Sequence, residues 1–97
     1  MDVDRIERKM EEKKVYIKRV FHVREIGVFG SFIRGEQTAS SDIDVLVDFE
    51  RGHKDFFNYM KLRYYLEELL QRKIDLVIKN AVKPRLRKRI FSEVEYV

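Results

Sequence analysis

Residues 42–49 are Asp-Ile-Asp-Val-Leu-Val-Asp-Phe, a stretch rich in β-branched residues that alternates well between apolar and other side chains. This period of two predicts a strand with one buried face. Asp42 and Asp44 are two positions apart, so both should project from the face opposite the buried one. Neighbouring carboxylates repel each other unless they share a proton or bind a cation, and Mg²⁺ commonly binds such oxygens. A lone pair of this kind could equally be two solvated aspartates at a strand start.

A third carboxylate, Asp75, lies inside a predicted strand at residues 73–78, where an acidic side chain lowers strand propensity. If this strand lies beside residues 42–49, Asp75 faces the same side as Asp42 and Asp44. Three carboxylates on one sheet face can hold two metal ions about 3.5–4 Å apart, an arrangement used in phosphoryl transfer.

A possible anion site precedes the acidic strand. Gly30 and Ser31 end a predicted strand and begin a helical turn, which places free backbone N–H groups and a hydroxyl where a phosphate can bind. Taken alone, the pair could be only a turn. Arg34 could contact a phosphate or be solvated.

The other segments alternate between helix and strand signals. This order predicts one α/β (α+β) domain over residues 1–97, a small mixed sheet with helices on one face. The predicted elements are a helix at 3–20, a strand at 23–29, a short helix at 31–34 closed by Gly35, a loop at 36–41, the strand at 42–49, a helix at 55–71, the strand at 73–78, a basic helix at 83–91 and a short strand at 94–97.

Composition limits the classes of protein to consider. The chain has 97 residues and no cysteine, so disulfides and thiolate metal sites are excluded. It has no apolar run near the about 20 residues of a membrane span and begins with acidic residues rather than a secretory leader, so we expect no membrane association and a cytoplasmic location. Charged residues reach 39%, and Asn and Gln are scarce, which is consistent with a thermophilic source.

The net charge of +4 is concentrated in one segment. Residues 83–89 carry five positive charges and no negative one, whereas the rest of the chain is nearly neutral. This distribution favours a local anionic partner over general nucleic-acid binding. The segment could meet an acidic protein surface, contact nucleotide phosphates or be solvated.

The combined motif is specific. Phe29-Gly30-Ser31-Phe32-Ile33-Arg34-Gly35 followed by Ser41-Asp42-Ile43-Asp44, with Asp75 downstream, resembles the nucleotidyltransferase superfamily related to DNA polymerase β. The closer resemblance is to its minimal group, the MNT proteins, often encoded beside a HEPN-type partner. It covers essentially the whole chain. Ile33 departs from the family, which usually has a small residue there, and its bulk could narrow the phosphate loop.

The resemblance implies a polymerase β-like nucleotidyltransferase core that is an enzyme using ATP and Mg²⁺, with two ions expected. Asp42, Asp44 and Asp75 would be the catalytic and metal-binding residues. Gly30, Ser31 and Arg34 would bind the nucleotide. MNT proteins act as antitoxins that transfer AMP from ATP to a tyrosine of a HEPN ribonuclease toxin, so a hetero-oligomer with such a toxin is expected.

Three alternatives stay open at this stage. The protein could be an antitoxin that neutralises a toxin by binding alone, without catalysis. It could transfer a nucleotide to a small molecule or an RNA end. A small nucleic-acid-binding protein that uses the basic helix is disfavoured, because the charge elsewhere is near neutral and no such signature is present.

Overall fold

A computed structural model describes residues 1–97 and contains one four-stranded sheet in the order β3-β2-β1-β4. Strand β1 (Val23–Phe29) pairs antiparallel with both β2 (Ile43–Phe49) and β4 (Glu95–Tyr96), whereas β2 pairs parallel with β3 (Ile74–Ile78). The sheet is therefore mixed. The predicted α/β fold class is confirmed, and the predicted strands are correct to within one or two residues.

The five α-helices are α1 (Val3–Glu12), α2 (Lys14–Val20), α3 (Ser31–Arg34), α4 (Phe56–Leu70) and α5 (Pro84–Glu93), and a 3₁₀ turn spans Lys79–Ala81. Local signals explain the helix ends. Asp2 and Asp55 cap α1 and α4, each accepting a backbone N–H at 3.0 Å, from Arg5 and Asn58. Pro84 occupies the first turn of α5, where no N–H partner is needed.

The helix predicted for residues 3–20 is wrong in one respect, because the chain breaks at Lys13 into α1 and α2. Residues 11–14 are all charged, so no apolar side chain holds this turn against the core. The break lets α2 bring Tyr16 toward α4, where its ring centroid lies 5.2 Å from that of Tyr65. Phe21 joins them, 5.4 Å from Tyr65.

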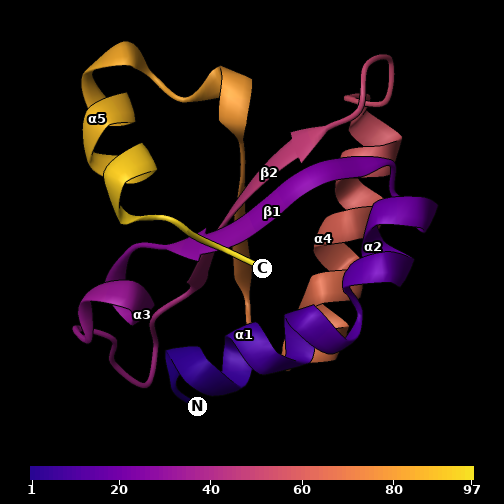
Figure 1. The fold of residues 1–97 in the computed structure, drawn as a ribbon. Coiled ribbons are helices and arrows are strands. Elements are labelled where there is room, and N and C mark those ends of the chain that lie inside the picture. The colour runs from indigo at the N-terminus through magenta and orange to yellow at the C-terminus, as the bar shows by residue number, and fades with distance from the viewer.

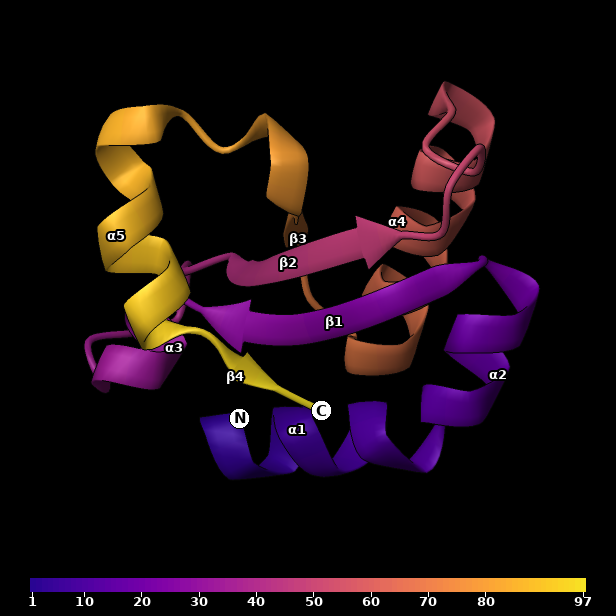
Figure 2. The ribbon, with the colours of Figure 1, turned by 45° about the horizontal axis from the view of Figure 1, so that its top comes forward.

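Helices cover both faces of the sheet, which corrects the expectation of a single covered face. Helices α1, α2 and α4 pack on the main core, which includes Ile43, Val45 and Val47 from β2. Helix α5 lies on the opposite side of the strands (Figures 1 and 2) and forms a second cluster with Phe29, Leu46, Val82 and Ile90. Leu46 shares the face of Asp44, and its apolar side chain requires this cover.

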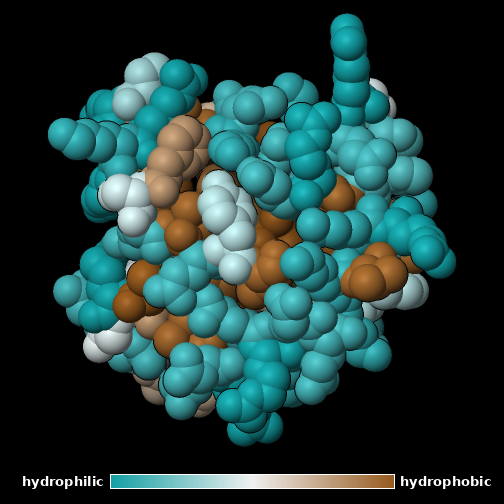
Figure 3. Space-filling model, in the orientation of Figure 1, coloured by the Kyte–Doolittle hydropathy of each residue, from teal (hydrophilic) through white to brown (hydrophobic).

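The two ends of the chain meet at the sheet edge, where α1 lies along the C-terminal strand (Figure 2). Gly27 permits β4 to approach β1, because a Cβ there would lie 2.6 Å from the Glu95 carbonyl oxygen. The outer surface is largely hydrophilic, with hydrophobic residues gathered toward the middle of the face drawn in Figure 3. None of the helices combines the length and apolar character needed to cross a membrane.

Candidate active site

Two of the three candidate carboxylates are direct neighbours. Parallel pairing of β2 with β3 places Asp44 opposite Asp75 in register. Asp44 is half-buried and Asp75 is exposed. Asp42, which is exposed, immediately precedes β2 and is close enough to influence the charge of Asp44.

Asp44 is the carboxyl group most affected by this crowding. Burial, together with the negative charges of Asp75 and Asp42, raises its pKa from an ordinary value of 3.8 to about 6, and burial is the largest cause. The Arg34 guanidinium opposes this effect. A divalent cation bound to these oxygens would offset the same repulsion, so the chemistry of the donors fits Mg²⁺. No group of three acidic or histidine side chains, however, lies close enough together in this structure to form a complete metal site.

The segment before Asp42 is held by Arg72, a residue that the sequence analysis did not single out. Its guanidinium donates hydrogen bonds to three backbone carbonyls of the loop between α3 and β2: those of Thr38, Ala39 and Ser41, at 2.8–2.9 Å. Arg72 lies two residues before the start of β3 and binds the loop that leads into β2. It therefore fixes the ends of both carboxylate-bearing strands relative to each other.

The glycine turn lies against the carboxylates. Gly30 has φ +82°, a conformation that favours glycine, and a side chain there would overlap the Asp44 carboxylate. The backbone N–H groups of Ser31 and Phe32 make no hydrogen bond within the chain, and neither does the Ser31 hydroxyl. These donors are therefore free to bind an anion beside Asp44.

The side chain of Ile33 does not line the cleft beside the glycine turn. It is half-buried and packs against the main core. Its bulk is accommodated there, so the expectation that it narrows the loop is wrong.

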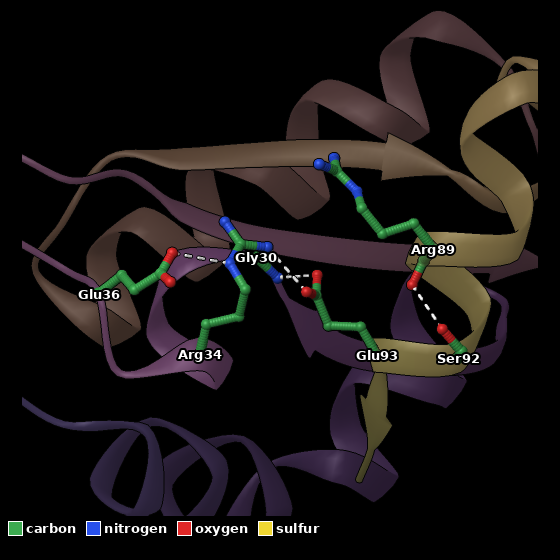
Figure 4. Close-up of polar contacts among 6 residues, drawn as sticks. All are labelled: Gly30, Arg34, Glu36, Arg89, Ser92 and Glu93. Carbon is green, nitrogen blue, oxygen red and sulfur yellow. Dashed lines mark hydrogen bonds and ion pairs between the residues drawn. The ribbon is translucent and has the colours of Figure 1, made fainter.

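Arg34 ends the turn and is held by two carboxylates (Figure 4). Its Nη1 donates to Glu93 at 2.7 Å, and its Nε donates to Glu36 at 3.0 Å. Glu93 also accepts the Gly30 N–H at 2.8 Å. Glu93 was not among the predicted site residues. One feature of the sequence could have indicated Glu93: it is the first acidic residue after the basic residues 83–89.

A cleft of about 380 Å³ lies between the sheet and α5 and joins these groups. Asp44 and Asp75 lie on its sheet side, beside Gly30 and Arg34. Three basic residues line the opposite side: Lys83, Arg85 and Arg89. Of the three roles left open for the basic segment, this placement favours contact with a phosphate, because cations face the carboxylates across the cleft.

Carboxylates beside a glycine turn, opposite a basic wall, suit the transfer of a phosphate-bearing group, in which metal-binding acids and cations share the charge of a polyphosphate. The class defined by this fold and cleft is that of nucleotidyltransferases. The sequence matches the model of the family described as "Nucleotidyltransferase domain" over residues 3–97, and the chain belongs to that family. The prediction that it is a nucleotidyltransferase enzyme is confirmed.

Individual relatives agree. The protein adenylyltransferase MntA of Thermococcus cleftensis is 41% identical over 97 residues, covering 100% of this chain and 97% of the relative. A solved structure provisionally described as a minimal nucleotidyltransferase superposes with a TM-score of 0.84 at 33% identity, covering 98% of this chain and 95% of that one. A toxin–antitoxin crystal structure with AMP-PNP has a TM-score of 0.70 at 25% identity, covering 89% and 70% of the two chains. The predicted resemblance to minimal nucleotidyltransferases is therefore confirmed.

Proposed function

We propose that the protein is a Mg²⁺-dependent protein adenylyltransferase that transfers AMP from ATP to a tyrosine hydroxyl of a partner HEPN-type ribonuclease toxin, and so acts as its antitoxin. The 41% identity to a protein adenylyltransferase supports a protein acceptor. The similarity to a toxin–antitoxin structure with an ATP analogue supports both the kind of partner and the nucleotide. The HEPN class and the tyrosine come from the family resemblance of the motif.

The observation that carries the proposal is the pairing of Asp44 with Asp75 directly beside Gly30. A carboxylate pair and free backbone donors in one cleft suit a metal-bound triphosphate. In the proposed site, Asp42, Asp44 and Asp75 hold the ions, and Gly30, Ser31 and Arg34 bind the triphosphate. When bound, Mg²⁺ would neutralise charge on the triphosphate and on the departing pyrophosphate.

The residues of the chain would orient the reaction as follows. Ser31 donates its hydroxyl and backbone N–H to phosphate oxygens, so the α-phosphorus lies near Asp44 and Asp75. The acceptor oxygen attacks this phosphorus in line, a new P–O bond forms, and the bond to the β-phosphate oxygen breaks to release pyrophosphate. Asp75, exposed at the mouth of the cleft, accepts the proton of the acceptor hydroxyl. Positioning and charge neutralisation account for most of the rate acceleration.

The test is transfer of label from α-³²P-ATP to the purified toxin in the presence of Mg²⁺. We expect labelling by the wild type and a loss of at least about 100-fold in the double variant Asp42→Ala/Asp44→Ala. Asp48→Ala is the matched control, because Asp48 lies on the same face of β2 but outside the cleft, near Arg24. It should label the toxin normally.

Omitting Mg²⁺ or adding EDTA should abolish labelling as well. If wild type and double variant both bind the toxin but neither labels it, a non-catalytic antitoxin becomes the better account. Label on a small molecule or an RNA end instead of the toxin would support nucleotidyl transfer by this protein, but to a different acceptor.

We further propose that residues 1–97 work as one domain in the cytoplasm, in a hetero-oligomer with the toxin. The single sheet that contains every strand supports the one-domain part of this proposal.

A further inference from the structure

The side chain of Glu93 bridges the two ends of the phosphate loop, which comprises residues 30–34, although Glu93 lies about 60 residues further along the chain. It belongs to the last residue of α5, yet its Oε2 accepts the Gly30 N–H at 2.8 Å and its Oε1 accepts Arg34 Nη1 at 2.7 Å (Figure 4). Only 12% of the Glu93 side chain is exposed. Both carboxylate oxygens thus make short, charge-assisted hydrogen bonds, and the bond to the Gly30 N–H is partly buried.

Arg34 depends on this carboxylate for its position. Its other partner, Glu36, is 65% exposed, and the Arg34 side chain itself is 38% exposed. An exposed pair of this kind contributes little to holding a long side chain in one place. Without Glu93, the guanidinium would be free to leave the cleft wall, where it now partly offsets the charge near Asp44.

Glu93 also ties the loop to the helix that forms the other wall of the cleft. One turn before it, Ile90 is buried in the second apolar cluster, and Arg89 lines the cleft. Directly after it, β4 pairs with β1 through Glu95 and Val28. Glu93 therefore lies between two fixed points of the backbone, which suits it to set the distance between the loop and the basic wall.

We propose that Glu93 is a positioning residue for the nucleotide: it orients Arg34 and the glycine turn toward the polyphosphate and couples the loop to α5. The inference deepens the proposed function and rests on ATP being the nucleotide. Glu93 itself does not touch the phosphates. It acts through Arg34 and Gly30.

The test measures ATP binding in the presence of Mg²⁺ by calorimetry on the toxin complex, together with KM and kcat for label transfer. Glu93→Gln loses the charge, and its NH₂ group cannot accept from a donor, so one of the two bonds is lost. We expect ATP binding to weaken and KM to rise by about 10-fold or more, with a smaller change in kcat. Glu36→Gln is the matched control, since it removes the exposed partner of Arg34, and it should change KM less than about 2-fold.

A double-mutant cycle separates positioning from general damage. In an Arg34→Ala background, Glu93→Gln should weaken ATP binding by clearly less than it does in the wild type, because its main target is gone. Equal effects in both backgrounds would overturn the proposal. So would wild-type ATP affinity in folded Glu93→Gln.

A second variant covers the case in which Glu93→Gln does not fold. Glu93→Asp keeps the charge but shortens the side chain, and it should bind ATP less tightly than the wild type. Wild-type affinity in Glu93→Asp would contradict the proposed role. If the wild type binds ATP and responds to Glu93 substitution but labels no toxin, this proposal stands while the proposed function fails.

Discussion

At the scale of single residues, Asp44 combines a cost to folding with a role in the proposed chemistry. It is half-buried, lies opposite another carboxylate and contacts a glycine that leaves no room for a side chain. Its pKa of about 6 means that the folded protein holds this proton more tightly than the unfolded chain does. Ionised Asp44 therefore destabilises the metal-free fold, a cost typical of functional sites.

The sign of the pH dependence follows from the raised pKa. Below the unfolded value of 3.8 both states are protonated, so Asp44 has no effect on stability. As the pH rises from there to about 6, the free energy of unfolding falls, and above that range the full cost remains. Asn, which resembles the protonated form, avoids this cost at every pH.

We therefore predict that Asp44→Asn raises the melting temperature of the metal-free protein at pH 8, in EDTA, by about 4–8 °C, equivalent to about 1 kcal/mol. Added Mg²⁺ should stabilise the wild type and have little effect on Asp44→Asn, because ligand binding to the folded state raises its stability. Thermal melts with and without Mg²⁺ measure both. Asp48→Asn should show no gain in EDTA, and a melting temperature of Asp44→Asn at or below that of the wild type would contradict the argument.

At the scale of elements, α5 shows what local sequence patterns can predict and what they cannot. Its basic character and its start near Pro84 were predictable from local spacing, but the face that it covers was not. The alternation of the strand places Leu46 on the same face as Asp44, and only tertiary packing shows that Ile90 helps to bury it there. Glu93 was missed for the same reason, since its partners lie 59 and 63 residues earlier.

The carboxylates were easier to place. The alternation of residues 42–49 and the acid within residues 73–78 predicted a shared face, and the parallel register of β2 and β3 brings Asp44 and Asp75 together on it. The break at Lys13 was not predictable from periodicity alone, because the apolar positions on its two sides still fall near helical spacing. Contacts of α2 with distant aromatic side chains determine its direction.

The basic residues of α5 differ in which side of the helix they occupy, which gives a prediction at this scale. Arg89 and Lys88 are both exposed, but only Arg89 lines the cleft. If the cleft holds the triphosphate, Arg89→Ala should raise the KM for ATP about 10-fold, and Lys88→Ala, which removes the same charge, should leave it nearly unchanged. Label transfer at varied ATP concentration measures this. Equal effects of the two variants would show that only the overall charge of the helix matters.

At the scale of the whole molecule, the fold is closed by its two ends. The C-terminal strand pairs with β1, and the Val97 N–H donates to the Ile26 carbonyl at 3.0 Å. Helix α1 lies along the same edge (Figure 2). Glu7 on this helix is half-buried, and its pKa is raised to about 7, first by burial and then by Glu95 and Asp4. The junction of the two ends therefore carries negative charges that repel one another at neutral pH.

This repulsion should make the contact between α1 and β4 less stable as the pH rises. Below the ordinary value of 4.5, Glu7 is protonated in both the folded and unfolded states and has no effect. Between that value and about 7, the folded state retains its proton while the unfolded state loses it, so the free energy of unfolding falls with pH. Glu7→Gln removes the ionised form and should raise the melting temperature at pH 8 by a few degrees, on the order of 1 kcal/mol once solvent screening is allowed for. At pH 4 the variant and the wild type should melt together.

Thermal melts from pH 4 to pH 8 test this prediction, with Glu11→Gln as the matched control. Glu11 lies one turn further along α1, is exposed and reaches Lys14 only at 4.0 Å, so its removal should change the melting temperature little at any pH. A gain from Glu7→Gln that is equally large at pH 4 and pH 8 would show that packing of the amide, rather than the lost charge, stabilises the variant. A gain confined to the higher pH would show that the ionised Glu7 carboxylate, which faces the negative charges of Glu95 and Asp4, is what destabilises the wild type.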